Sequence, residues 1–213
     1  MSAYPTAIRV LAVDDHPLVR GGITALLANT PDIELVAEAS TGREAIEMFD
    51  LHRPDVTLMD IQMPDMSGID AIIAIRARIP AARFIVLTTY RGDVLAHRAM
   101  RAGAQAYLLK SQVRKDLVDT IRAVFEGERR IDTDVAMQIA QHSTDETLTL
   151  REVAVLEKMA SGNSNKLIAR ELDIADGTVK THVKSILSKL HAQDRTHAVT
   201  LGIQRGIIEL DDD

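Results

Sequence analysis

Short apolar runs alternate with amphipathic stretches over the first 125 residues of the chain. Five runs have the length and composition of buried strands, at 8–13, 33–39, 56–59, 84–87 and 106–109. The segments between them, such as 18–27 and 69–75, repeat apolar residues at the 3.6-residue spacing of a helix. Five strand–helix units in series predict a five-stranded, doubly wound parallel sheet with helices on both faces.

The pattern after residue 147 is helical throughout. Helices are predicted at about 150–160, 165–172, 177–190 and 195–205. Thr149 and Glu152 have the spacing of a capping box, and Leu148 and Val153 that of its hydrophobic staple. Only four residues, 173–176, separate the second and third helices, which predicts a helix-turn-helix within a four-helix, all-α domain.

The change of pattern divides the chain into three parts. Gly127 and the charged residues 128–130 close an α/β domain over 1–127. Residues 128–147 are interpreted as a linker that includes a short helix at 132–142, and residues 148–213 form the helical domain.

The chain has 213 residues, a formal net charge of -6 and no cysteine. The absence of cysteine removes disulfides and thiolate chemistry, and the sequence has neither a signal peptide nor a membrane span, so a cytoplasmic location without a membrane partner is expected. The acidity lies mainly at 131–147 and 209–213, each with a charge of -4. Residues 148–208 carry nine bases and six acids, so this domain is mildly basic.

Polar residues follow the predicted strands. Asp14 and Asp15 follow the first strand, Asp60 the third, Thr88 the fourth and Lys110 the fifth. In a sheet of order 2-1-3-4-5 these residues meet at one edge, where binding sites gather. Three crowded carboxylates repel one another unless a cation joins them, and oxygen ligands favour Mg²⁺. A single aspartate after a strand is more often a helix cap, but five polar groups at neighbouring strand ends indicate a phosphoryl site.

These residues, with Met63, Pro64, Gly68 and 107–110, resemble the receiver domain of two-component response regulators, a flavodoxin-like fold, over residues 8–127. The resemblance implies that Asp60 accepts a phosphoryl group from a sensor histidine kinase. It also implies that Mg²⁺ is bound by three carboxylates and one backbone carbonyl, from Asp14, Asp15, Asp60 and Gln62. Thr88 and Lys110 would contact the phosphoryl oxygens, and Tyr107 would be the rotamer switch.

Two positions depart from the receiver pattern. Thr89 replaces a common alanine and is expected to narrow access to the phosphoryl group. Ser111 follows the lysine where many receivers have proline, which leaves the isomer of the Lys110–Ser111 bond open, because a cis bond without proline costs roughly 2.5 to 4 kcal/mol. The side chains of Gln62 and Tyr90 are expected to tune the lifetime of the phosphoaspartate.

The third helix of the C-terminal domain has an apolar stripe and a polar face. The stripe consists of Val179, Val183, Ile186, Leu187 and Leu190. The opposite face is small, hydroxylated and basic, with no acid expected on it, and its candidate DNA contacts are Lys180, Thr181, Lys184, Ser185 and Ser188. The helix is expected to carry its own cap. Because every aromatic residue lies at or before Phe125, stacking on single-stranded bases is disfavoured.

Residues 164–169, 178–183 and 189–190, with Arg195 and Thr196, resemble the LuxR-type (NarL-like) DNA-binding domain over 148–208. Leu150 stands where many relatives have proline. The resemblance implies a NarL/LuxR-type response regulator that binds double-stranded promoter DNA at inverted half-sites. It further implies a homodimer that forms on phosphorylation, and RNA polymerase as a partner.

Three other functions remain open. The first is a phosphohydrolase with Asp60 as nucleophile, although Gln62 stands where that chemistry wants a second acid. The second is a nucleotide- or flavin-binding protein, against which residues 14–17 place negative charge where a glycine-rich phosphate loop would be needed. The third is a DNA-binding regulator whose receiver works without phosphorylation. The leading interpretation is not an enzyme but a stoichiometric, Mg²⁺-dependent phosphoryl acceptor.

Overall fold

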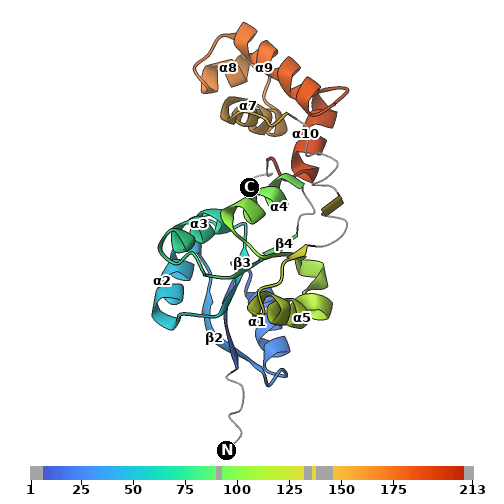
Figure 1. Ribbon diagram of the computed structural model, residues 1–213. Helices are drawn as coiled ribbons and strands as arrows, with labels where there is room; N and C mark the ends of the chain where they lie inside the picture. Colours follow the sequence, from blue (N-terminus) through green and yellow to red (C-terminus); the bar gives the residue numbers. More distant parts are fainter. Residues whose placement is uncertain (1–6, 90–92, 132–135, 138–145, 209–213) are drawn as a thin grey trace, which may run out of the picture. The chain divides into compact units, whose positions relative to one another are not determined.

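The computed structural model describes residues 7–89, 93–131, 136–137 and 146–208. These residues form two compact units, an α/β unit and a helical unit, and each is described by itself (Figure 1). Within the described residues, no helix is both long enough and apolar enough to cross a bilayer.

The α/β unit is built on a parallel sheet of order β2-β1-β3-β4-β5-β6. Its strands are β1 (Ile8–Val13), β2 (Ile33–Ala39), β3 (Val56–Asp60), β4 (Phe84–Thr88), β5 (Ala106–Leu109) and β6 (Arg130–Ile131). The five predicted strands and their order are confirmed. The sixth strand was not predicted, because it has only two residues and lies in the segment interpreted as a linker. It extends the sheet by pairing with the strand that carries Tyr107.

Helices cover both faces of this sheet. They are α1 (Pro17–Leu27), α2 (Gly42–His52), α3 (Gly68–Arg78), α4 (Asp93–Ala102) and α5 (Val113–Phe125). Apolar side chains of α1 and α5 join those of the central strands in one buried cluster, while α2 and α3 lie across the opposite face (Figure 1). The strands read as continuous apolar runs because both of their faces are buried.

Between residues 146 and 208, four helices of the helical unit pack around a core of their own. They are α7 (Leu150–Ala160), α8 (Asn165–Glu171), α9 (Asp176–Lys189) and α10 (Arg195–Gln204). Val179, Ile186 and Leu190 of the predicted stripe are buried, and Val183 and Leu187 pack against the same cluster. The helix-turn-helix is therefore confirmed as α8 and α9. Of the helix expected at 132–142, residues 136–137 are helical and the rest lies outside the described residues.

The two caps predicted in this unit have different outcomes. Thr149 and Glu152 form the expected capping box at the start of α7, with both reciprocal hydrogen bonds present. The cap expected for α9 was wrong. Its N-cap is Ala175, which makes no side-chain hydrogen bond, so α9 is held by its buried stripe and not by a cap of its own.

Candidate functional site

Three charged side chains meet at the carboxyl edge of the sheet. Asp60 is the last residue of β3, Asp14 follows β1, and Lys110 follows β5. Lys110 Nζ donates a hydrogen bond of 2.8 Å to Asp60 Oδ2. It also lies 2.8 Å from Asp14 Oδ2, in a second ion pair. The sheet order therefore brings residues 14, 60 and 110 together, as the sequence predicts.

Keeping these charges buried costs free energy, because they lose their hydration. The side chains of Asp14 and Asp60 are 0% and 3% exposed, so water solvates neither of them well. Burial is the main reason that the pKa of Asp60 rises to about 6; Lys110 acts against this rise. Burial alone would lower the pKa of Lys110, but the two carboxylates outweigh it and raise that pKa. One ammonium group thus serves two buried acids.

Two carboxylate oxygens of the site are buried and accept no hydrogen bond, namely Asp14 Oδ2 and Asp15 Oδ1. Ligand atoms of Asp14, Asp15, His16 and Asp60 all lie within 4.8 Å of one another. Carboxylate oxygens gathered around one point are the ligands that a hard divalent cation takes. The residues present therefore fit Mg²⁺.

His16 is a neighbour of this cluster that the sequence did not single out. Its backbone N–H donates to Asp14 Oδ1 at 2.9 Å, and its Nδ1 lies 2.6 Å from Asp15 Oδ1. The first contact fixes the rotamer of Asp14. The run Asp14–His16 contains the signal, since an amide two residues after an aspartate often bonds back to it.

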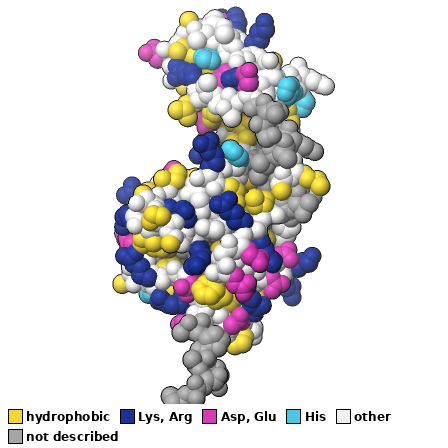
Figure 2. All heavy atoms as spheres, in the orientation of Figure 1, with side chains coloured by type: hydrophobic (Ala, Val, Ile, Leu, Met, Phe, Trp, Pro, Cys, Tyr) yellow, Lys and Arg dark blue, Asp and Glu magenta, His cyan; other side chains and the backbone are white. Residues whose placement is uncertain are grey.

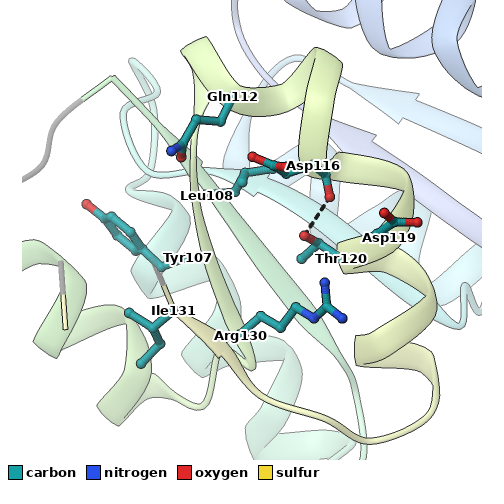
Figure 3. A pocket seen from close by; sticks show the side chains of 8 residues that line it. All are labelled: Tyr107, Leu108, Gln112, Asp116, Asp119, Thr120, Arg130 and Ile131. Atoms are coloured by element: carbon teal, nitrogen blue, oxygen red, sulfur yellow. Dashed lines mark hydrogen bonds between the residues drawn. The ribbon is translucent and has the colours of Figure 1, made fainter. Parts of the chain in front are cut away.

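Thr88 and Tyr107 lie on neighbouring strands, and both are buried. Burial raises the pKa of Tyr107 to about 12, against a hydrogen bond with the Thr88 side chain. Tyr107 also borders a pocket of about 190 Å³, whose lining includes Asp116, Asp119 and Ile131 (Figure 3). The predicted switch residue therefore contacts the residue that ends β4 and lines a pocket that the sequence did not reveal.

A tight loop follows Asp60. Gln62 N–H points to Asp60 Oδ1 at 3.4 Å, and Gly68 N–H donates to the carbonyl of Ile61 at 2.8 Å. A Cβ at position 68 would overlap the carbonyl oxygen of Asp60. Glycine is therefore required at this position so that α3 can begin against the end of β3.

The two departures from the receiver pattern can be located. Thr89 is exposed. The described residues contain no cis peptide bond, so the Lys110–Ser111 bond is trans and leads into a short 3-10 helix at Lys110–Gln112. Tyr90 lies outside the described residues.

Four of the five candidate DNA contacts on α9 are exposed, namely Lys180, Thr181, Lys184 and Ser188. Ser185 is not on this face, because its hydroxyl donates to Glu152 Oε1 at 2.6 Å inside the helical unit. The expectation of an acid-free face also needs correction, since Lys180 Nζ lies 2.7 Å from Asp176 Oδ2. On the face of the α/β unit seen in Figure 2, side chains of both signs of charge are present.

Glu152 has a larger role than its cap. In addition to the Thr149 contacts, it accepts hydrogen bonds from Ser185 Oγ and, at 2.9 Å, from Lys189 Nζ. It thereby ties α7 to α9 through a buried carboxylate. The sequence shows the capping box, but the partners 33 and 37 residues away follow only from the packing of the helices.

Comparison with known proteins finds one family for each of two segments of the chain. Residues 10–122 match the response regulator receiver domain, and residues 146–201 match the luxR family of bacterial regulatory proteins. The response regulator protein VraR of Staphylococcus epidermidis is 39% identical over 208 residues, covering 95% of this chain and all of that protein. VraR of Staphylococcus aureus is 40% identical over 207 residues, with coverage of 95% and 99%.

Solved structures show similar architectures. The response regulator ChrA of a heme-sensing two-component system has 38% identity and a TM-score of 0.57, covering 95% of this chain and 99% of ChrA. A complex of the response regulator RcsB with DNA has a TM-score of 0.68 at 23% identity, covering 93% and 99%. The second comparison supports the fold alone.

Proposed function

Because the chain belongs to the two-component response regulators, with a receiver domain and a LuxR-type DNA-binding domain, we propose that Asp60 is its phosphoacceptor. A sensor histidine kinase would supply the phosphoryl group, and the modification would control DNA binding and transcription. The observation that carries this proposal is the buried pair of Asp60 and Asp14 on a single lysine.

In the transfer, a carboxylate oxygen of Asp60 attacks phosphorus as the P–N bond of the phosphohistidine breaks. The histidine leaves with the electron pair of that bond and takes up a proton. Lys110 Nζ, already 2.8 Å from Asp60 Oδ2, holds the nucleophile in place and offsets its charge. Such reactions depend on positioning and charge neutralisation more than on covalent assistance. The lysine supplies both.

Asp14, Asp15, Asp60 and the Gln62 carbonyl would hold Mg²⁺, which neutralises charge on the transferring phosphoryl oxygens when it is bound. The clustering of carboxylate oxygens from Asp14, Asp15 and Asp60 within 4.8 Å supports this ligand set. A phosphoryl group adds about two negative charges. Thr88 and Lys110 would meet them, and Thr88 would exchange its hydrogen bond with Tyr107, which moves in response.

The DNA-binding part of the proposal rests on α9. Its exposed residues Lys180, Thr181, Lys184 and Ser188 would enter the major groove, whereas Ser185 stays with Glu152. Two copies that pair on phosphorylation would bind inverted half-sites about one helical turn apart. RNA polymerase would then be the partner at the promoter.

Phosphorylation at Asp60 can be tested with Mg²⁺ and a small acyl phosphate, followed by intact-protein mass spectrometry. We expect one phosphoryl group on the wild type and none on Asp60→Asn. Asp50→Asn is the matched control, because Asp50 is an acid on α2 that contacts only arginines in the described contacts, at 2.6 and 3.7 Å. Equal labelling of Asp60→Asn and wild type would exclude Asp60 as the acceptor.

The DNA face can be tested with Lys184→Ala against Lys158→Ala. Lys158 is a half-buried lysine of α7 that pairs with Glu171 at 3.1 Å and lies outside α9. If Lys184 contacts phosphate, its loss should lower the slope of log affinity against log salt by about one. If it reads guanine, the loss should be roughly 1 to 3 kcal/mol and sequence-selective. No change in either quantity, or an equal change in Lys158→Ala, would remove Lys184 from the interface.

A further inference from the structure

Asp65 connects the loop after Asp60 to the start of a different helix. Its Oδ1 accepts a hydrogen bond of 2.9 Å from Gly42 N–H, and its Oδ2 accepts one of 3.1 Å from Arg43 N–H. These residues open α2, whose first amides have no partner within the helix. The carboxylate therefore uses both of its oxygens to fasten the β3–α3 loop to α2.

A close backbone contact reinforces this connection. Gly42 is buried, and a Cβ there would lie 2.8 Å from the carbonyl oxygen of Met66 and 2.9 Å from its Cβ. The loop therefore packs directly against the first turn of α2. Burial alone would raise the pKa of Asp65, but backbone amides, among them those of Gly42 and Arg43, together outweigh it and hold that pKa below its usual range.

The loop fixed in this way includes Gln62, whose carbonyl is the one backbone ligand expected for Mg²⁺. Next to the site, this loop is held by the hydrogen bond from Gly68 N–H to the carbonyl of Ile61 and by the contact of Gln62 N–H with Asp60 Oδ1. Farther along, the loop is held by the hydrogen bonds between Asp65 and the first amides of α2. Mg²⁺ requires near-ideal octahedral geometry at about 2.0 to 2.1 Å, so a small displacement of one ligand weakens binding.

We propose that Asp65 is a positioning residue that sets the Mg²⁺ affinity of the receiver site, because it anchors the loop that presents the Gln62 carbonyl. This inference rests on the proposed function, which assigns that carbonyl to the metal. Asp65 does not touch the reacting groups and acts through the loop. Residues that orient metal ligands from outside typically contribute 10- to 100-fold in metal affinity.

The test is calorimetric titration of the full-length protein with Mg²⁺ alone. We expect Asp65→Ala to weaken binding about tenfold, at the lower end of that range. Asp65→Asn should give a smaller loss, because its single carbonyl oxygen can accept from one of the two amides. At saturating Mg²⁺, the rate of phosphorylation by a small acyl phosphate should return to the wild-type value in both variants. A general loss of structure would not be rescued in this way.

Three further variants distinguish displacement of the loop from the loss of one negative charge. Asp50→Ala removes the same charge from a side chain of similar exposure, 33% against 25% for Asp65, but it leaves the loop untouched. Its Mg²⁺ affinity should stay within about twofold of wild type. Gly42→Ala should weaken Mg²⁺ binding without any change of charge, because the new Cβ displaces Met66. Gly21→Ala on α1 meets no atom within 4 Å and should have no effect.

The inference is overturned if Asp65→Ala and Gly42→Ala both bind Mg²⁺ within twofold of wild type, or if Asp50→Ala loses as much affinity as Asp65→Ala. Gly42→Ala decides the question if Asp65→Ala fails to fold. The proposed function fails separately, when Asp60→Asn is labelled as well as wild type. The Mg²⁺ titration tests the role of the loop whether or not Asp60→Asn is labelled.

Discussion

Each unit of the molecule contains a buried carboxylate beside a lysine, and the two clusters are built differently. In the receiver, Lys110 Nζ lies 2.8 Å from both Asp14 and Asp60. In the DNA-binding domain, Lys189 Nζ lies 2.9 Å from one carboxylate, that of Glu152, and also donates to the carbonyl of Thr147 at 3.2 Å. The distances are almost equal, so the contacts themselves do not distinguish the clusters. The clusters differ in the number of carboxylates that share one lysine, which is two at Lys110 and one at Lys189.

Glu152 is fully satisfied. Burial alone would raise its pKa, but hydrogen bonds from Ser185, Thr149 and Lys189 outweigh it and lower the pKa to about 2. Both of its oxygens accept hydrogen bonds, and every donor belongs to the same domain. Such a network stabilises one arrangement of α7 and α9.

At Asp60, burial outweighs the stabilising partners, which is the reverse of the balance at Glu152. Its pKa is raised to about 6 because burial outweighs the help from Lys110, and the neighbouring Asp14 raises it further. The adjacent oxygens Asp14 Oδ2 and Asp15 Oδ1 accept no hydrogen bond. Two buried acid–lysine contacts of nearly equal length therefore differ in balance: Glu152 has a donor for each of its oxygens, whereas Asp14 and Asp60 share one lysine.

Glu152→Ala should have the largest effect on stability. It leaves Lys189, whose side chain is 16% exposed, without its buried partner, and breaking a buried pair costs about 3 to 5 kcal/mol. Hydrogen exchange resolved by mass spectrometry should show faster exchange in α7 and α9 and no change in the receiver strands. The control Glu171→Ala removes a surface pair and should cost less than about 1 kcal/mol. Equal effects of the two variants would contradict the structural role.

Acid should weaken the same domain. The folded-state pKa of Glu152 is about 2, below its ordinary value of 4.5, so its contribution is present above pH 4.5 and is lost as pH falls towards 2. The loss should approach about 3 kcal/mol. Exchange in α9 followed from pH 5 to pH 2.5, after correction for intrinsic rates, would measure it. Glu152→Gln should flatten this pH dependence, and an unchanged slope would refute the assignment.

Asp60→Asn should have a smaller effect of opposite sign. Without divalent ions, removing one of two crowded charges should stabilise the receiver by about 1 to 2 kcal/mol, since unmet buried charge is costly. Thermal unfolding in a chelator would measure the gain, with Asp50→Asn as the control. The gain should shrink when Mg²⁺ is added, because only the wild type retains all three carboxylates. Destabilisation in the chelator would show that Asp60 is structural, like Glu152.

The sequence by itself determined the elements and the residues at their ends. Continuous apolar runs predicted the five strands, the stripe through Val179 and Ile186 predicted α9, and strand order alone brought Asp14, Asp60 and Lys110 to one edge. Each of these features depends on local periodicity or on a rule of topology, so it can be inferred without coordinates.

Only the tertiary structure decided which polar groups find partners. It paired Ser185 with Glu152 and so removed Ser185 from the DNA face, it joined Asp65 to Gly42, and it added β6 beside β5. It also left α9 without a cap. These contacts join residues far apart in the chain, where a rotation of one helix or a shift of a loop by a few ångströms changes the partner. Periodicity determines which face of an element is buried, and packing determines what each buried polar atom meets there.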